Sequence, residues 1–408
     1  MESSSPQPGQ RKRALLGVTA LLIIAAVLAS AYWLLWGRRH VGTDNAYVAG
    51  NLVQVSAQQP GTVTAILADD TDLVEAGAPL VQLDDADARV QLQAAEAALA
   101  DTVRAVRGLY AGDSQARAGV AARSADVQRS QHELERAQAE LRRAGDEFAR
   151  RESLFRQNFI SGEALQTART ALDASRASRD AASSALEQAR STVAQARSQQ
   201  AGTEGLVDHT TLDTHPRVQA AAAKLRDAHL ALARTRIVAP VRGHVAKRSV
   251  QVGARIAAGT PLLSVVADDQ LWVEANFKES ELGAMRIGQP VRLESDLYGS
   301  SVEYRGSIAG IASGTGSVFS VLPAQNASGN WIKVVQRLPV RIALEPDDLK
   351  QHPLRLGLSM HATVDTSRSE GEILAGTPRQ GPAFQTEVYA SQAAEADALI
   401  ERVIRANR

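Results

Sequence analysis

Residues 86–235 repeat apolar side chains at intervals of seven, separated mainly by arginine, glutamate, glutamine and alanine. Heptads sustained over this length predict a coiled coil of α-helices. The successive registers are Leu92, Leu99, Val106, Val120, Val127, Leu134, Leu141, Phe148 and Phe155, then Leu165, Leu172, Leu186 and Val193, then Val218, Leu225 and Leu232. The alternative, an ordinary helical-bundle core, would need more large apolar residues than this segment contains.

The middle of this segment carries a turn signal at residues 158–162, so we expect an antiparallel hairpin with its tip there. Ser161 is predicted to cap the second helix. A turn-like stretch, Gly108–Asp113, interrupts the first arm, and Gly202–His215 breaks the returning arm before Pro216, a residue suited to a first helical turn. The two interruptions are about equally far from the tip, which predicts that the helical pairing of the two arms is interrupted at the same distance from the tip.

The hairpin is flanked by two similar stretches of short alternating strands broken by Gly and Pro. Residues 55–87 align without a gap on residues 237–269, 182 positions later. The shared residues are Ala57, Gly61, Val63, Ala76, Gly77, Pro79, Leu80 and Asp87, which fall on Ala239, Gly243, Val245, Ala258, Gly259, Pro261, Leu262 and Asp269. Neither copy is long enough to bury a core alone. We therefore expect residues 51–85 and 236–267 to pair into one β-sandwich that the hairpin splits.

Residues 268–366 alternate in short runs separated by turn signals, a pattern that predicts a small β-barrel. Residues 41–50 are expected to add one strand to it. The tail, residues 367–408, begins as a linker, and its segment Ala390–Arg405 has the pattern of an amphipathic helix without an assigned function. The predicted fold class is α+β, with several domains.

An uncharged run of 23 residues, Ala14–Trp36, lies between basic clusters near the amino end. At ~1.5 Å per residue, a helix of this length reaches ~34 Å, enough to cross a hydrocarbon layer of ~30 Å. The alternative is a signal peptide cleaved near Ala29–Ala31, but the apolar run continues past that site. We expect an uncleaved transmembrane helix with residues 1–13 in the cytoplasm and the rest of the chain outside it.

The composition of the 408-residue chain excludes several classes of function. Formal net charge is zero, so no global basic field points to nucleic acid. Cysteine is absent, which excludes disulfides, thiol catalysis and cysteine-ligated metals. Neither a phosphate-binding loop nor a nucleophile elbow is present, so we expect no enzyme, no catalytic residues and no cofactor. The polar break in the returning arm contains Asp208, His209, Asp213 and His215. A metal site formed by these residues is the weaker interpretation, and solvated polar side chains are the stronger one.

Five runs match a known family: Thr43–Val48 (TDNAYV), Arg236–Gly243 (RIVAPVRG), Leu271–Glu279 (LWVEANFKE), Gly314–Ser317 and Trp331–Val340. These runs resemble the HlyD/EmrA-type membrane fusion proteins, the periplasmic adaptor subunits of tripartite multidrug efflux pumps. The last two are similar to the drug-efflux branch that works with fourteen-helix major-facilitator transporters. The resemblance covers about residues 41–365.

This resemblance implies an N-terminal transmembrane helix in the Gram-negative inner membrane, with a lipoyl-like β-sandwich, a long helical hairpin and a β-barrel in the periplasm. It implies three partners: an inner-membrane exporter, a TolC-like outer-membrane channel, and further copies of the adaptor in a ring or sheath. Adaptors of this kind often carry Arg, Leu and Ser at fixed spacing at the hairpin tip. Here Arg150, Leu154 and Ser161 match that spacing, and the resemblance implies that they contact the channel.

The lipoyl-like fold raises a second possibility, a lipoyl or biotinyl carrier domain. Such a carrier needs a lysine at the turn between the two halves, but no lysine occurs between Lys12 and Lys224. Another alternative is a type I secretion adaptor that serves an ABC exporter of peptides or proteins. It shares the fold, and the hairpin alone does not separate the two functions.

Overall fold

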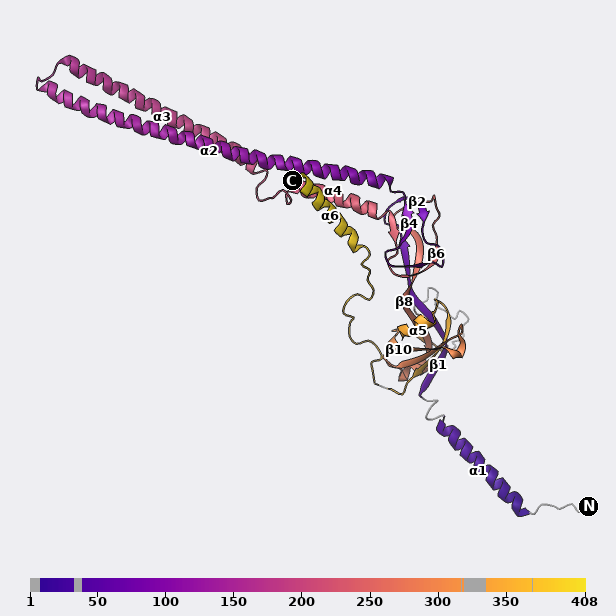
Figure 1. The fold of residues 1–408 in the computed structure, drawn as a ribbon. Helices are drawn as coiled ribbons and strands as arrows, with labels where there is room; N and C mark the ends of the chain where they lie inside the picture. Colours follow the sequence, from indigo (N-terminus) through magenta and orange to yellow (C-terminus); the bar gives the residue numbers. More distant parts are fainter. Residues whose placement is uncertain (1–7, 33–38, 317, 319–334, 369) are drawn as a thin grey trace, which may run out of the picture. The chain divides into compact units, whose positions relative to one another are not determined.

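The computed structural model describes residues 8–32, 39–316, 318, 335–368 and 370–408 (Figure 1). The chain divides into two compact units. The first comprises residues 1–84 and 235–389 and contains the β-strands. The second comprises residues 85–234 and 390–408 and is helical.

Antiparallel strands close into a barrel in the first unit. The order runs from β1 (His40–Ser56) through β12 (Ser359–Asp365), β9 (Pro290–Ser295), β10 (Glu303–Ile311) and β11 (Arg337–Leu344) to β8 (Pro261–Lys278), and β8 pairs back onto β1. The short helices η2 (Glu279–Ala284), η3 (Gly299–Ser301) and α5 (Pro346–Gln351) connect strands. Phe277, Leu293 and Tyr304 fill the interior with no exposed surface. The predicted barrel is therefore present, and the amino-terminal strand joins it as expected.

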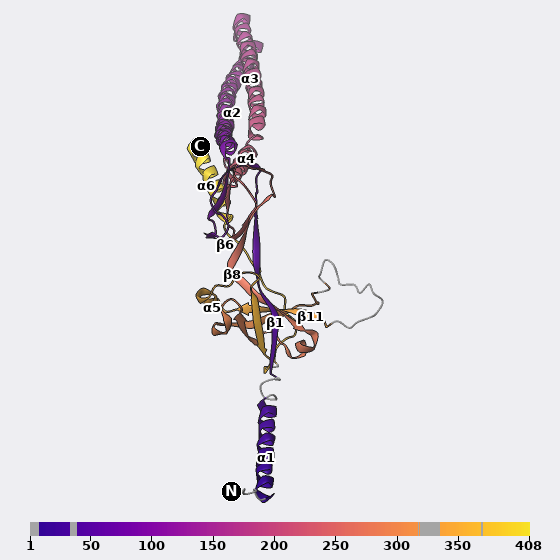
Figure 2. The same ribbon diagram turned by 90° about the vertical axis from the view of Figure 1, so that its right-hand side faces the viewer.

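The strands β1 and β8 are long enough to continue from the barrel into a second layered structure (Figure 2). Their outer halves form a sheet with β6 (Gly243–Arg248) and β3 (Leu73–Val74). A four-stranded sheet contains β5 (Arg236–Val238), β4 (Pro79–Leu83), β2 (Gly61–Ile66) and β7 (Arg255–Ile256). One hydrophobic core joins both sequence copies, with Val63, Leu80 and Leu83 packed among Val245, Leu262 and Val265.

Backbone hydrogen bonds between the two copies come in reciprocal pairs related by the 182-residue offset. The Gly77 amide donates to the Ala239 carbonyl at 2.8 Å, and the Gly259 amide donates to the Ala57 carbonyl at 2.7 Å. Both glycines have positive φ, 85° and 86°, which favours glycine in this turn. The bonds from Val63 to Ala254 and from Val245 to Asp72, each 2.9 Å, repeat the relation. The two halves thus form one sandwich with approximate two-fold symmetry.

The second unit is an antiparallel helical hairpin. Helix α2 (Ala86–Arg156) runs beside α3 (Gly162–Glu204) and then α4 (Pro216–Ala233). The heptad prediction is confirmed for much of the seam, because these predicted positions are buried: Leu99, Val106, Leu172, Leu186, Val193, Val218 and Leu225. Other heptad positions, such as Leu134 and Leu141, are half-buried.

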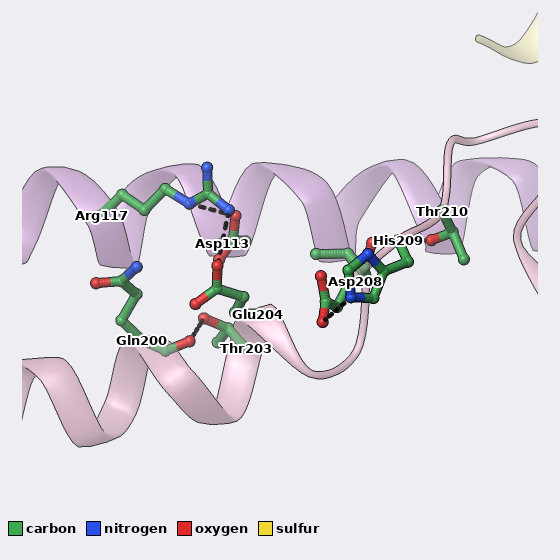
Figure 3. A network of polar contacts seen from close by, with 9 residues as sticks. Asp113, Arg117, Gln200, Thr203, Glu204, Asp208, His209 and Thr210 are labelled. Carbon is green, nitrogen blue, oxygen red and sulfur yellow. Dashed lines mark hydrogen bonds and ion pairs between the residues drawn. The ribbon is translucent and has the colours of Figure 1, made fainter.

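The prediction of a break at Gly108–Asp113 is wrong, because α2 is a continuous helix of 71 residues. A glycine inside a helix costs only about 1 kcal/mol, and the packing of the adjacent Val103 and Val106, both fully buried, opposes that cost. Asp113 is itself buried rather than part of a turn. Its carboxylate pairs with Arg117 at 2.9 Å, and Arg117 also reaches Glu204 in α3 at 3.4 Å (Figure 3). The sequence signal was two glycines and a polar residue, which tertiary contacts overrode.

The break in the returning arm is confirmed, since α3 ends at Glu204 and α4 begins at Pro216. His215 is the N-cap of α4. Its Nδ1 accepts from the Arg217 amide at 3.2 Å, and its Nε2 lies 3.1 Å from the Leu206 carbonyl oxygen. Both ring nitrogens are thus engaged by backbone, and no group of three or more potential metal ligands forms anywhere in the described ranges.

The predicted tail helix is α6 (Ala390–Asn407), and it packs against α2 and α4. Ala396 and Ile400 are buried, and Asp397 forms an ion pair with Arg226 of α4. At the end of the helix, Arg104 of α2 donates to Asn407 at 2.6 Å. This part of the hairpin therefore has three helices, where the remainder has two.

Helix α1 (Pro8–Tyr32) covers most of the predicted membrane segment. Its described large apolar side chains are exposed, among them Leu16 at 70% and Leu21 at 69%. Trp33–Trp36 lie outside the described residues, as do Ser317 and Trp331–Val334 of the resembling runs. Among the residues that the structure describes, no helix is long and apolar enough to cross a membrane.

Candidate functional site at the hairpin tip

The tip begins where α2 ends, in a Schellman motif. Asn158 has a left-handed φ of 63°, a conformation that asparagine tolerates better than most residues. Its amide donates to the Phe155 carbonyl at 2.9 Å, and the next amide, that of Phe159, donates to the Leu154 carbonyl at 2.9 Å. The motif satisfies carbonyls that the end of a helix otherwise leaves without partners.

The returning helix begins with the predicted cap. The Ser161 hydroxyl accepts from the Ala164 amide at 3.2 Å, which confirms Ser161 as the N-cap of α3. Arg151 ties the two helices together, because it pairs with Glu147 on α2 and donates to the Ala164 carbonyl at 3.3 Å. Hydrogen bonds from both arms thus hold the chain at the turn.

The predicted contact residues occupy different environments. The Arg150 side chain is 70% exposed and forms an ion pair with Glu147. Leu154 lies one turn later and is half-buried, and Ser161 is exposed across the turn. Within the described part of the chain, no hydrogen bond or ion pair joins these three side chains. The structure brings the three residues to the same end of the hairpin.

The register at the tip differs from the heptad prediction, which placed Phe155 in the seam and Leu154 beside it. Phe155 is 40% exposed, whereas Leu154 is half-buried. Leu154 is the C3 residue of the Schellman motif, a position that frequently makes an apolar contact with the C″ residue, here Phe159. Leu154 is thus less exposed than Phe155 where the helix ends, and a heptad count that assumes a regular helix to its last turn misses this.

Sequence reasoning also missed Phe159, whose side chain is 73% exposed at the turn. A signal was present in the sequence. Only 4% of the chain is aromatic, yet Phe155 and Phe159, two of its six phenylalanines, lie four residues apart at the predicted tip. Such a concentration at the predicted tip of a polar hairpin indicates a surface feature rather than a core.

A second candidate is a polar cavity of about 280 Å³ in the barrel, lined in part by Thr43, Asp44, Lys278, Glu281 and Arg337. Lys278 and Glu281 form an ion pair with each other at 3.4 Å. Cationic and anionic side chains are mixed, so the cavity has no dominant charge with which to select a ligand.

Comparison with known proteins places the hairpin and the whole chain in a family. A family model described as the EmrA alpha-helical hairpin domain matches residues 136–235, which include the tip. The multidrug export protein EmrA of Escherichia coli is 42% identical over 411 residues, covering 100% of this chain and 98% of that protein. The chain belongs to the EmrA family of membrane fusion adaptor proteins.

Other EmrA-family proteins match at similar length. The fatty acid resistance protein FarA of Neisseria gonorrhoeae is 43% identical over 395 residues, covering 97% of this chain and 92% of that protein. A solved structure of the periplasmic adaptor protein EmrA covers 80% of this chain and 98% of its own, with 20% identity and a TM-score of 0.37. The EmrA family consists of adaptors without enzymatic activity, in agreement with the prediction that this protein is not an enzyme.

Proposed function

We propose that this protein is the periplasmic adaptor of a tripartite multidrug efflux pump. It joins an inner-membrane major-facilitator exporter to a TolC-like outer-membrane channel. The observation that carries the proposal is the 42% identity to a multidrug export protein along the full length of the chain. The type I secretion alternative has less support, because the full-length relatives are named for drug export and fatty acid resistance.

The architecture suits a protein that acts by assembly. Helix α2 alone is about 105 Å long at ~1.5 Å per residue, a length that serves reach rather than the burial of a core. A single hairpin encloses no conduit, so several copies surround the transport path as a ring or sheath. Substrate selection then belongs to the exporter.

The test is affinity capture of the tagged protein from cells that contain its exporter and channel. Recovery of both, with higher drug accumulation when the adaptor is deleted, is expected. Capture of an ABC exporter, with loss of a secreted polypeptide, would favour type I secretion instead.

Residues 14–36 anchor the adaptor in the inner membrane as a single uncleaved helix, with the bulk of the chain in the periplasm. Support comes from 23 uncharged residues between basic clusters and from the exposed apolar side chains of α1. The mature protein is expected to begin at or near Met1 and to stay with the membrane pellet after alkaline extraction. A mature amino terminus near Tyr32 would instead indicate a cleaved signal peptide.

Arg150, Leu154 and Ser161 belong to the surface that meets the outer-membrane channel. Replacement of Leu154 by Asp is expected to abolish efflux, because a charge would enter an apolar contact that is repeated in every copy of the adaptor. Since Leu154 is half-buried, the helicity of the variant must be measured beside its efflux. The matched control is Leu134→Asp, a half-buried seam position away from the tip, which should lower hairpin stability without a specific loss of channel capture. Full channel capture by Leu154→Asp would exclude this residue from the contact.

A further inference from the structure

The hairpin tip presents one phenylalanine whose side chain is mostly exposed. Phe159 is 73% exposed, whereas Phe155 is 40% exposed and its ring leans toward Gly162. A Cβ built on Gly162 would lie 4.0 Å from Phe155 Cε2. Leu154 is half-buried in the cap. Of these three apolar residues, Phe159 has the most surface available to another molecule.

The backbone that carries Phe159 is fixed before any partner arrives. Its own amide is bonded to Leu154, the preceding amide to Phe155, and Ser161 caps α3 two residues later. The left-handed Asn158 sets the direction in which the chain leaves α2. An apolar side chain on a preorganised turn loses little conformational freedom on binding. An exposed aromatic held in this way is typical of an anchor residue.

The last turns of α2, which precede Phe159 in the chain, carry paired charges. Arg156 pairs with Glu152 at 3.0 Å and remains 74% exposed, and Arg150 pairs with Glu147. Protein interfaces commonly have an apolar centre surrounded by polar groups that stay in contact with water. Insertion into lipid would need a broader apolar face and unpaired basic residues, whereas this tip exposes Phe159 and, to a smaller extent, Phe155, and its arginines Arg150 and Arg156 are paired. The pattern favours a protein partner.

We propose that Phe159 is the apolar anchor of the tip and fits an apolar notch, of the size of one benzyl ring, on the outer-membrane channel. This inference rests on the proposed function, which supplies the partner. It goes beyond the Arg150, Leu154 and Ser161 motif because it assigns the central contact to a residue outside that motif. Each copy of the adaptor in the assembly supplies one Phe159 side chain, so a contact that is weak by itself is repeated in every copy.

Two experiments test the anchor in the full-length, membrane-anchored protein. In the first, a photoreactive phenylalanine analogue is placed at position 159, and at His132, a site on α2 that is 78% exposed. The analogue at 159 should crosslink to the channel, and the analogue at His132 should not. Crosslinking from 159 to lipid rather than to the channel would overturn the assignment of a protein partner.

In the second experiment, channel capture is compared for Phe159→Ala, Phe159→Leu and the matched control Phe384→Ala, which removes a phenylalanine that is 54% exposed elsewhere. Phe159→Ala should reduce capture on the order of tenfold, while Phe159→Leu should retain most of it because it keeps an apolar side chain. Helicity by circular dichroism should be unchanged in all three. Wild-type capture by Phe159→Ala would overturn the anchor and leave the proposed function intact. Failure of the wild-type protein to capture any channel would overturn the proposed function itself.

Discussion

Replacement of Gly243 by alanine is expected to destabilise the β-sandwich by about 3 kcal/mol or more, whereas the same replacement at Gly61 should change its stability by less than about 1 kcal/mol. The two glycines occupy equivalent positions in the sequence repeat, 182 residues apart. Their surroundings differ. A Cβ on Gly243 would lie 1.9 Å from the Val266 carbonyl oxygen and 2.7 Å from its carbonyl carbon. Both are backbone atoms of the paired strand β8, so the clash can be relieved only if strands β6 and β8 move apart.

A Cβ on Gly61 would meet only the side chain of Leu83, at 3.4 Å, which is within ordinary contact distance. Comparison of the two alanine variants therefore distinguishes the effect of a backbone clash from the general effect of adding a methyl group. Native-state hydrogen exchange of β2, β6 and β8 in the full-length protein is the suitable measurement, because it reports this layer separately from the helical unit. Equal loss of protection in the two variants would contradict the close approach of β6 and β8.

The sequence repeat was sufficient to predict that the two halves form one sandwich, because neither half has enough apolar residues for its own core. The repeat does not reveal the asymmetry at Gly243, since this depends on how closely two strands approach. The closure of the barrel follows from pairing of β8 with β1, a long-range contact that alternating patterns suggest but do not specify.

In the helical unit, the sequence prediction differs from the structure where packing or capping overrides the local pattern. Local signals indicated a turn at Gly108–Asp113, yet the packed neighbours of α2 keep the helix continuous. At the tip, the heptad count placed Phe155 in the seam, but where the helix ends in a capping motif Phe155 is exposed and Leu154 is half-buried. The amphipathic pattern of the tail predicted the helix α6, but a pattern cannot say which surface that helix covers. Tertiary contacts therefore decide the outcome for α2 and α6, whereas a local capping motif decides it at the tip.

The packing of α6 against α2 and α4 is the basis of the second large expected effect on stability. Leu225→Asp is expected to destabilise the three-helix part of the hairpin by about 4 kcal/mol or more, because it buries a charge without a partner. Leu225 has no exposed surface, and it packs in one cluster with Leu99 and Val103 of α2 and Ile400 of α6. Leu134→Asp, in the two-helix part, should cost about 1–2 kcal/mol, since Leu134 is half-buried and water can reach the introduced carboxylate.

Urea denaturation followed by helical circular dichroism compares the two variants, with hydrogen exchange of α6 as a local measure. Leu225→Asp should release α6 and lower the midpoint strongly, while Leu134→Asp should leave α6 protected. A chain truncated after Tyr389 supplies the decisive control. If α6 completes the burial of Leu225, the truncated chain should start from a lower stability and lose less on Leu225→Asp than the intact chain does. The loss from Leu134→Asp should be the same in both backgrounds, because distant sites contribute additively. An equal loss from Leu225→Asp with and without residues 390–408 would mean that α2 and α4 alone bury this leucine, and that α6 only rests on a core that is already closed.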